Sequence, residues 1–266
     1  MTKTLICLLL CFSINAKSAE TVALKFGIVP QQSATQLLEL WAPLIQKMAS
    51  DCKCKIDFQT APDISSFENN VKAGLYDIVY LNPFHFVNYQ SVGYNALVRE
   101  DGRRLKGLVV VKNDSPIKNL EDLKDQQIAF PGPTSFAATI LVQKLFEQKN
   151  IKITPTFVKS HESVYFNVIA GLMPAGGGIN RTMDNLSAED RAKLRILTTT
   201  QEVTPHPIAI HNRVSSQLRS EFLKTLTSLK DSPLGKNILE KLQLKPLVEA
   251  KNSDWDDVRK FMNDKR

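Results

Sequence analysis

The sequence lacks the local patterns that commonly mark an enzyme or a metalloprotein. Its 266 residues contain no G-x-S-x-G elbow, no H-E-x-x-H pair and no phosphate-binding P-loop. Histidine is scarce, and the residues lie too far apart along the chain to indicate a shared metal site: His85, His161, His206 and His211. We therefore expect a protein that is not an enzyme and that needs neither a cofactor nor a metal ion.

Cysteine is scarce as well. Two of the four cysteines lie in the N-terminal segment, which leaves Cys52 and Cys54, one residue apart. An oxidising compartment permits a disulfide between them, although the ring would be tight, and two ligands at this spacing make a poor zinc site. Cys54 also continues the alternation that includes Ile56. We favour the interpretation that Cys54 is an inward-facing strand residue, and the pattern leaves the bonding of the two sulfurs open.

Long apolar runs are absent after the N-terminus. The first 18 residues have the plan of a secretory signal peptide, with a lysine near the start, an apolar run at Leu5–Ile14 and small residues around Ala16–Ala19. The apolar run is too short to span a membrane, and no later segment is long and apolar enough to do so. We expect residues 1–18 to be removed and the mature chain to be periplasmic.

Dense clusters of one charge are also absent. The formal net charge is +7, but the basic residues are scattered, and Arg103-Arg104 is the densest run. The chain has no basic, aromatic-rich motif, so we expect no nucleic-acid partner. This mild basicity fits an anionic ligand, an anionic membrane surface, or neither in particular.

What the sequence does contain is an alternation of apolar strands and amphipathic helices. The strand pattern Val22–Val29, for example, is followed by a helix pattern at Ser33–Ala49. Such alternation predicts an α/β fold. We expect two lobes, each a mostly parallel sheet flanked by helices, with two hinge crossings.

Two polar segments beside prolines are the predicted hinges, Lys112–Ser115 and Val203–Pro207. The chain would then build lobe 1 from residues 19–112 plus 204–266, and lobe 2 from residues 113–203. A small ligand would bind in the cleft between the lobes, where strand ends and helix starts face each other.

The stretch Gln127–Gln148 is the strongest candidate for a ligand cradle. An apolar strand, Ile128–Phe130, leads through a Pro-Gly-Pro turn to Thr134 and Ser135, and a helix pattern follows. Free backbone N–H groups and hydroxyls at a helix start suit an anion. The alternative is that Thr134 or Ser135 serves only as a helix cap.

Several motifs, taken in order, resemble one family. They are Phe26–Gln31, Ala61–Asp63, Tyr76–Tyr80, Lys112–Leu123, Pro133–Ser135, Ser160–Glu162 and Pro205–Ile208. Their order and spacing are similar to those of the phosphate/phosphite/phosphonate substrate-binding proteins of ABC transporters, the PhnD-like family. The resemblance covers nearly the whole mature chain. It implies a type II periplasmic binding protein fold, a monomer, a small anionic ligand and an ABC permease partner in the inner membrane.

The resemblance also implies site residues. Thr134 and Ser135 match hydroxyl positions of the family, His161 matches its histidine, and Tyr80 falls where an aromatic residue lines the cleft. Phe136 stands at the third hydroxyl position and Ala137 at the usual glycine, so backbone N–H groups would complete the cradle.

Other positions depart from the family or extend its site. Pro174 replaces an acidic residue that contacts the amine of aminophosphonates, while Ile64 and Leu81 replace tyrosines. Asn82, Gln31 and Gln32 are further candidate donors at helix starts, with a cap or a solvated loop as the alternative. Arg181 could reach an anion, although a surface arginine is the commoner case.

The predicted function is capture of a small phosphorus oxyanion, a phosphonate, phosphite or phosphate, for an ABC transporter. The substituted positions leave two alternatives. One is an exported sensor or interaction module of the same fold with an altered pocket. The other is a binder of a metabolite without phosphorus.

Overall fold

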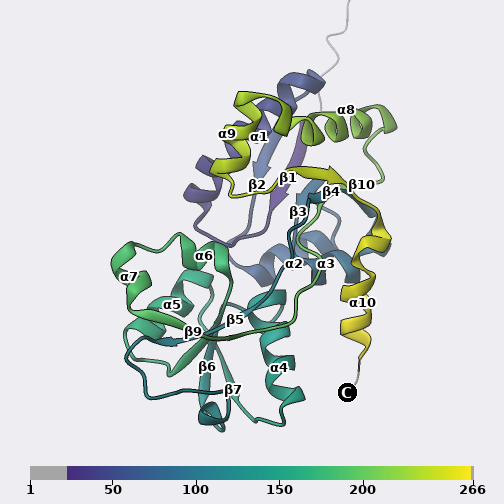
Figure 1. Cartoon of the computed structure of the whole chain (residues 1–266). Helices are drawn as coiled ribbons and strands as arrows, with labels where there is room; N and C mark the ends of the chain where they lie inside the picture. Colours follow the sequence, from purple (N-terminus) through teal and green to yellow (C-terminus); the bar gives the residue numbers. More distant parts are fainter. Residues whose placement is uncertain (1–22, 265–266) are drawn as a thin grey trace, which may run out of the picture.

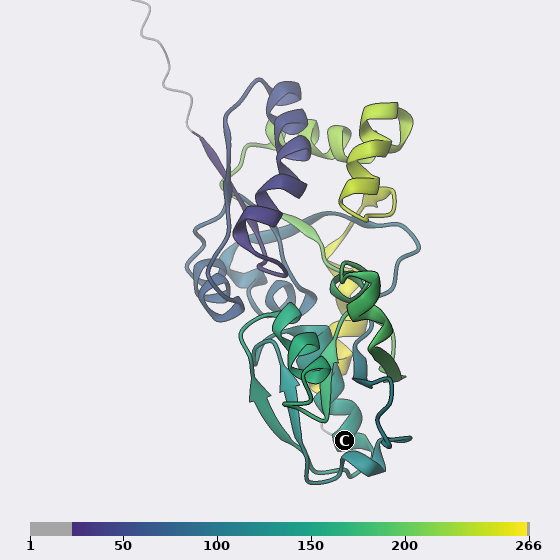
Figure 2. The ribbon, with the colours of Figure 1, turned by 90° about the vertical axis from the view of Figure 1, so that its left-hand side faces the viewer.

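The computed structural model describes residues 23–264, so the predicted signal peptide, residues 1–18, lies outside the described residues. The chain forms two α/β lobes, which lie one above the other in Figure 1 and again in the perpendicular view of Figure 2. Within residues 23–264, no helix is both long and apolar enough to cross a membrane.

Lobe 1 is built on a six-stranded sheet in the order β11-β4-β10-β3-β1-β2. Its strands are β1 (Leu24–Ile28), β2 (Ile56–Gln59), β3 (Ile78–Tyr80), β4 (Tyr94–Glu100), β10 (Ile208–His211) and β11 (Leu247–Glu249). Its helices are α1 (Ala34–Cys52), α2 (Ile64–Lys72), α3 (Pro83–Asn88), α8 (Ser216–Thr227), α9 (Pro233–Lys241) and α10 (Asp256–Asn263). The helix α1 begins at a capping box between Ser33 and Gln36, and its Trp41 packs edge-on against Phe26 of β1.

Lobe 2 is built on a five-stranded sheet in the order β7-β6-β8-β5-β9. Its strands are β5 (Leu108–Lys112), β6 (Gln127–Phe130), β7 (Thr154–Phe157), β8 (Ala175–Gly178) and β9 (Leu194–Thr199). Its helices are a π-helical segment (Phe136–Leu141), α4 (Val142–Gln148), α5 (His161–Ile169), α6 (Asn180–Asp184) and α7 (Ala188–Ala192). The predicted two-lobed α/β fold is therefore confirmed.

The sheets are mixed, whereas the sequence predicted mostly parallel ones. In lobe 1, β1, β2 and β3 pair in parallel, but β10 lies antiparallel between β3 and β4. In lobe 2, β6 pairs in parallel with β7 and β8, but β5 lies antiparallel between β8 and β9. The chain forms β5 and β10 directly after crossing from the other lobe, and the edge strand β11 also pairs antiparallel with β4.

The first crossing also lies earlier than predicted. Because β5 belongs to the sheet of lobe 2, the chain crosses at residues 101–107 rather than at Lys112–Ser115. The second crossing, residues 200–207, includes the predicted hinge Val203–Pro207. The two crossings pair with each other, since Leu105 and Val203 exchange backbone hydrogen bonds of 2.8 and 2.9 Å.

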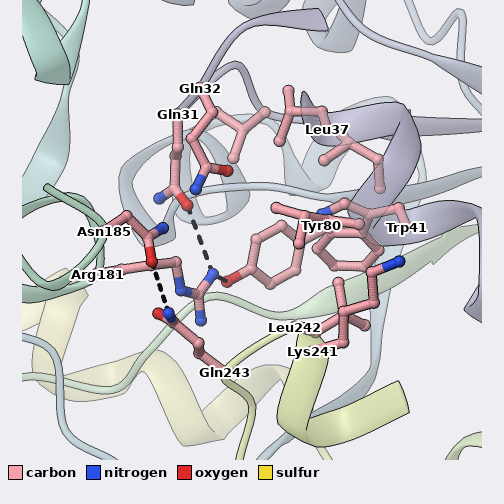
Figure 3. Close-up of a pocket in the computed structure, with 13 residues that line it drawn as sticks. Gln31, Gln32, Leu37, Trp41, Tyr80, Arg181, Asn185, Lys241, Leu242 and Gln243 are labelled. Carbon is pink, nitrogen blue, oxygen red and sulfur yellow. Dashed lines mark hydrogen bonds between the residues drawn. The ribbon is translucent and has the colours of Figure 1, made fainter. Parts of the chain in front are cut away.

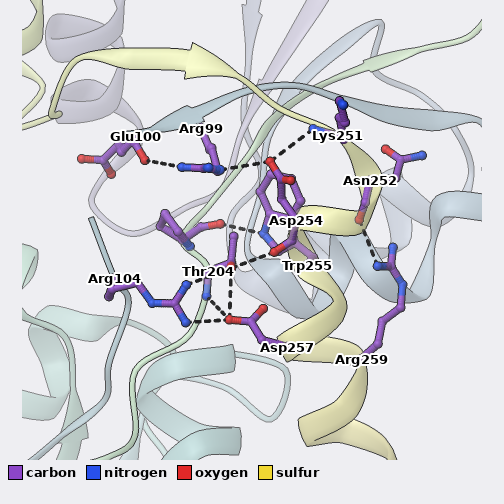
Figure 4. Close-up of polar contacts among 11 residues, drawn as sticks. Arg99, Glu100, Arg104, Thr204, Lys251, Asn252, Asp254, Trp255, Asp257 and Arg259 are labelled. Carbon is purple, nitrogen blue, oxygen red and sulfur yellow. Dashed lines mark hydrogen bonds and ion pairs between the residues drawn. The ribbon is translucent and has the colours of Figure 1, made fainter. Parts of the chain in front are cut away.

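The start of α10 braces both crossings from the side of lobe 1 (Figure 4). The carboxylate of Asp257 accepts a hydrogen bond of 2.7 Å from Arg104 of the first crossing and one of 2.9 Å from the backbone N–H of Thr204 in the second. The indole of Trp255 donates to the carbonyl of Pro205 at 2.8 Å. Both crossings are thus tied to the start of α10 in lobe 1.

Cys52 and Cys54 form a disulfide, so our favoured interpretation of Cys54 is wrong. Cys52 ends α1, and Lys53 has φ 51°, which turns the chain before β2 begins at Ile56. Cys54 therefore lies in the turn and not in the strand. Cys54 lies two residues before Ile56, the first residue of β2, so the alternation continued past the paired segment into the turn.

Candidate ligand-binding site

The turn after β6 delivers Ser135 into the interface between the lobes. The hydroxyl of Thr139 donates to the carbonyl of Gly132 at 2.7 Å, which closes the turn at the start of the π-helical segment. Ser135 is 3% exposed, and its Oγ lies 3.3 Å from Nε2 of His161. Within the described chain Ser135 makes no side-chain cap hydrogen bond. Its hydroxyl is therefore available to a ligand rather than used as a helix cap.

His161 is the first residue of α5, and Ser160 caps that helix. The imidazole is 3% exposed, and burial lowers its pKa to about 4. Its Nδ1 has no hydrogen-bond partner among the described residues. At neutral pH the ring is therefore uncharged. A bound anion would raise its pKa again.

Lobe 1 contributes polar groups to the opposite wall. Nε2 of Gln31 lies 3.1 Å from Nε2 of His206, and both side chains are buried. Asn82 caps α3 through its Oδ1 and also donates from Nδ2 to the backbone carbonyl of Thr134 at 3.1 Å. It therefore serves both as the predicted cap and as a contact across the cleft.

These groups enclose a small cavity between the lobes, which we call the central cavity. It is lined by Val29, Gln31, Ile64, Asn82, Ser135, Phe136, Ala137, His161, Ile179 and His206. Its volume is ≈ 10 Å³, which is room for about one water molecule. The lobes are therefore closed on each other, and a ligand larger than water requires them to separate.

Thr134 lies beside the central cavity but faces lobe 1. Its Oγ1 is 3.3 Å from Nε2 of His85, and the same nitrogen lies 3.7 Å from the carboxylate of Glu68. Burial raises the pKa of Glu68, but hydrogen bonds from His85, Tyr89 and Thr134 outweigh it and bring the pKa to about 2. The hydroxyl of Thr134 thus joins an anionic cluster of lobe 1 instead of lining the cavity.

Phe136 is the residue at the third hydroxyl position, and it fills space between the lobes. Its side chain is 1% exposed and packs edge-on against Phe261 of α10, with ring centroids 6.0 Å apart. Phe136 and Ala137 line the central cavity with apolar surface. This wall is therefore tighter and drier than three hydroxyls would make it.

Tyr80 and Gln32 line a second cavity of ≈ 40 Å³, shown in Figure 3. Tyr80 stacks on His206 with ring centroids 5.2 Å apart and is 2% exposed. Its hydroxyl accepts a hydrogen bond of 2.7 Å from Nη1 of Arg181. Gln31 lines both cavities, so the two are neighbours.

Arg181 is the functional candidate that the sequence undervalued. Its side chain comes from α6 of lobe 2, is 16% exposed, and reaches lobe 1 (Figure 3). Besides Tyr80 it contacts Oε1 of Gln31 at 3.5 Å and Oε1 of Glu100 at 3.5 Å. From the sequence, His206 was likewise considered as one of the dispersed histidines and as part of a hinge, but not as a ligand contact. Each residue had one signal in the sequence: Arg181 comes shortly after the strand β8, and His206 lies within the second crossing.

The glycines of β8 explain how Arg181 is placed. A Cβ at Gly176 would collide with Val164, and one at Gly178 would collide with the hydroxyl of Tyr165. That hydroxyl donates to the carbonyl of Ile179 at 2.7 Å and accepts from its N–H at 2.9 Å. Close packing of α5 on β8 therefore sets the backbone just before Arg181.

Two lobes joined by two crossings, with buried polar groups converging on the cleft, define a class. The fold is that of the type II periplasmic binding proteins, as the match with the aliphatic sulphonate binding protein of Escherichia coli also shows, with a TM-score of 0.57 and 17% identity. That match covers 86% of this chain and 80% of the other.

The family follows from the sequence itself. A profile described as "ABC transporter, phosphonate, periplasmic substrate-binding protein" matches residues 26–255, and the chain belongs to this family. The phosphonates-binding periplasmic protein of Escherichia coli K12 is 23% identical over 240 residues, which are 84% of this chain and 71% of the relative.

Solved structures agree on the fold. A binding protein component of an ABC phosphonate transporter from Pseudomonas aeruginosa superposes with a TM-score of 0.83 at 16% identity, over 91% of this chain and 86% of the other. PhnD1 from Prochlorococcus marinus, solved in complex with methylphosphonate, gives a TM-score of 0.80 at 16% identity, over 90% and 96% of the two chains. The predicted family and its fold are thereby confirmed.

Proposed function

We propose that this protein captures a small phosphonate between its lobes and delivers it to an ABC permease in the inner membrane. The observation that carries the proposal is the pairing of Ser135 and His161 in a buried cavity whose far wall is polar. Family membership and the methylphosphonate complex of PhnD1 support it. The protein would act as a monomer, would be exported by the signal peptide 1–18, and would release its ligand unchanged.

The ligand would bind with its oxyanion at the start of the π-helical segment. The hydroxyl of Ser135, the imidazole of His161 and the backbone N–H groups at Phe136 and Ala137 are the donors on lobe 2. Gln31, Asn82 and His206 would close from lobe 1. Because the central cavity holds about one water, binding requires a hinge rotation at the two crossings.

The test is isothermal titration calorimetry of the mature protein with methylphosphonate, phosphite, phosphate and 2-aminoethylphosphonate. We expect saturable binding of methylphosphonate, and a loss of about tenfold or more in Ser135→Ala, because a hydrogen bond to a charged group contributes about 1.5–3 kcal/mol. Ser220→Ala, on the exposed face of α8, is the matched control and should bind as the wild type does. No heat with any phosphorus oxyanion would refute the proposal.

A second candidate is an exported sensor or interaction module that works without a phosphonate. The observation in its favour is the closed cleft, in which Thr134 and Phe136 serve contacts between the lobes. If calorimetry gives no heat and the closed form persists in solution, this second function replaces the first.

A further inference from the structure

Arg181 places a positive charge beside the central cavity. It lines the second cavity together with Gln31, and on its other side it lines a third cavity of ≈ 50 Å³ together with Glu100 and His206. Gln31 lines all three spaces, and His206 lines the central and the third. The spaces therefore meet around these side chains, and Arg181 faces the part of a ligand that extends beyond Ser135 and His161.

The positive charge of Arg181 is only partly compensated. Glu100 is its carboxylate partner at 3.5 Å, but the same carboxylate pairs with Nε of Arg103 at 2.8 Å and accepts the backbone N–H of Lys245 at 2.9 Å. One carboxylate thus serves two guanidinium groups. Arg104 also lines the third cavity, so the surroundings of Arg181 are basic.

The other groups at the site are neutral. Burial keeps the pKa of His161 at about 4, and burial with the charge of Arg181 holds the pKa of His206 well below its usual range. Among the described residues, no aspartate or glutamate lines the central cavity, and Glu100 is the one carboxylate in the linings of the three cavities. A ligand that carries an ammonium group would meet the partly compensated positive charge of Arg181, while a second anionic group would meet a partner.

We propose that Arg181 is a second anion subsite and that the ligand is a small phosphonate bearing a carboxylate or another negative group. This inference rests on the proposed function, since the phosphonate itself would bind at Ser135 and His161. The guanidinium has five N–H donors, and within residues 23–264 its polar contacts use Nη1 and Nη2 only. Arginine can hold a carboxylate through two parallel hydrogen bonds. When Arg181 turns to the ligand, the carboxylate of Glu100 would keep its ion pair with Arg103 and its hydrogen bond from the backbone N–H of Lys245.

The test compares three probes on the wild-type protein by calorimetry near neutral pH: phosphonoacetate, methylphosphonate and 2-aminoethylphosphonate. We expect phosphonoacetate to bind about tenfold or more tightly than methylphosphonate, as for one added charge-assisted hydrogen-bonded contact. We expect 2-aminoethylphosphonate to bind more weakly than methylphosphonate. This comparison needs no variant, so it cannot be confused with a folding defect.

Two variants assign the preference to Arg181. Arg181→Met should reduce the ratio of the two dissociation constants, methylphosphonate over phosphonoacetate, to near unity. Arg181→Lys keeps the charge but not the paired donors, so its ratio should be intermediate. Arg191→Met, on α7 of the same lobe and outside the three cavity linings, is the matched control and should keep the wild-type ratio.

Each unfavourable result has a separate meaning. If the wild type binds methylphosphonate but shows no preference for phosphonoacetate, the second subsite is refuted and the proposed function stands. If Arg181→Met weakens both ligands equally, Arg181 only holds the lobes together, and the inference also fails. If no phosphonate binds at all, the proposed function fails and this inference fails with it.

Discussion

Replacing His161 with glutamine should flatten the acid limb of the stability curve. The wild-type imidazole is 3% exposed, and burial lowers its pKa from 6.5 to about 4. Glutamine can offer an amide nitrogen to Ser135 but cannot take up a proton. The variant therefore removes the titration while it keeps a polar partner for the hydroxyl.

The direction of the pH dependence of stability follows from the pH at which the folded and the unfolded state each bind the proton. The unfolded chain protonates this histidine below about pH 6.5, whereas the folded protein keeps it neutral down to about pH 4. Between these values the unfolded state binds more protons, so stability falls as the pH falls. The shift corresponds to about 3 kcal/mol, at about 1.4 kcal/mol per pKa unit, and the loss is complete by about pH 4.

Urea unfolding followed by tryptophan fluorescence at a series of pH values measures this loss. His161→Gln should retain about 3 kcal/mol more of its neutral-pH stability at the acid end than the wild type does. Part of the remaining acid sensitivity would come from His206, whose pKa burial lowers in the same direction, and part from Glu68, whose lowered pKa also makes the fold lose stability as the pH falls below about 4.5. His211→Gln is the matched control, because His211 is only half-buried and should leave most of the acid limb unchanged.

If the free energy of unfolding of His161→Gln falls with pH as steeply as that of the wild type, the reasoning is refuted. It would mean that the imidazole is solvated or already charged in the ligand-free protein. A lower stability of the variant at neutral pH would not matter for this test, since only the change with pH reports the titration.

Three further predictions follow from the packing. Gly177→Ala should destabilise the fold by about 2–4 kcal/mol in urea unfolding, because its Cβ would collide with the carbonyl of Ala138; an unchanged midpoint would contradict the packing. Replacing both Cys52 and Cys54 by serine should lower the free energy of unfolding by only about 1.5 kcal/mol, because the disulfide closes a very short loop. A decrease above about 4 kcal/mol would contradict this. Asn82→Ala removes a hydrogen bond between the lobes, so the ligand-free protein should have a larger radius of gyration in solution scattering. An unchanged radius would show that other contacts hold the cleft closed.

The fold was predictable because its signals are local. The alternation of strands and helices identified the α/β class, and the ordered motifs identified the family. The first hinge was misplaced because the apolar strand β5, Leu108–Lys112, would fit the core of either lobe equally well by its sequence. Sheet membership and strand direction depend on pairing with β8 and β9, which the sequence of β5 does not specify.

The candidate site was predictable only where its residues lie in a turn motif. Ser135 and His161 follow strands at helix starts, and the structure brings them together across 26 positions. Arg181 meets Tyr80 across 101 positions and Gln31 across 150, and no local pattern encodes such a contact. A buried arginine and a surface arginine look alike until the lobes are placed on each other.

Phe136, which narrows the central cavity, also changes how closure of the two lobes contributes to ligand affinity. Phe136 packs on Phe261, and Thr134 contacts His85, so lobe 2 is held against lobe 1 before any ligand binds. A ligand shifts an open–closed equilibrium only by its differential affinity for the two forms, and its apparent affinity falls by the fraction of competent protein. A cleft that closes without ligand excludes it sterically, since the central cavity holds about one water. The ring contact between Phe136 and Phe261 therefore competes with ligand capture, and weakening it should speed ligand entry.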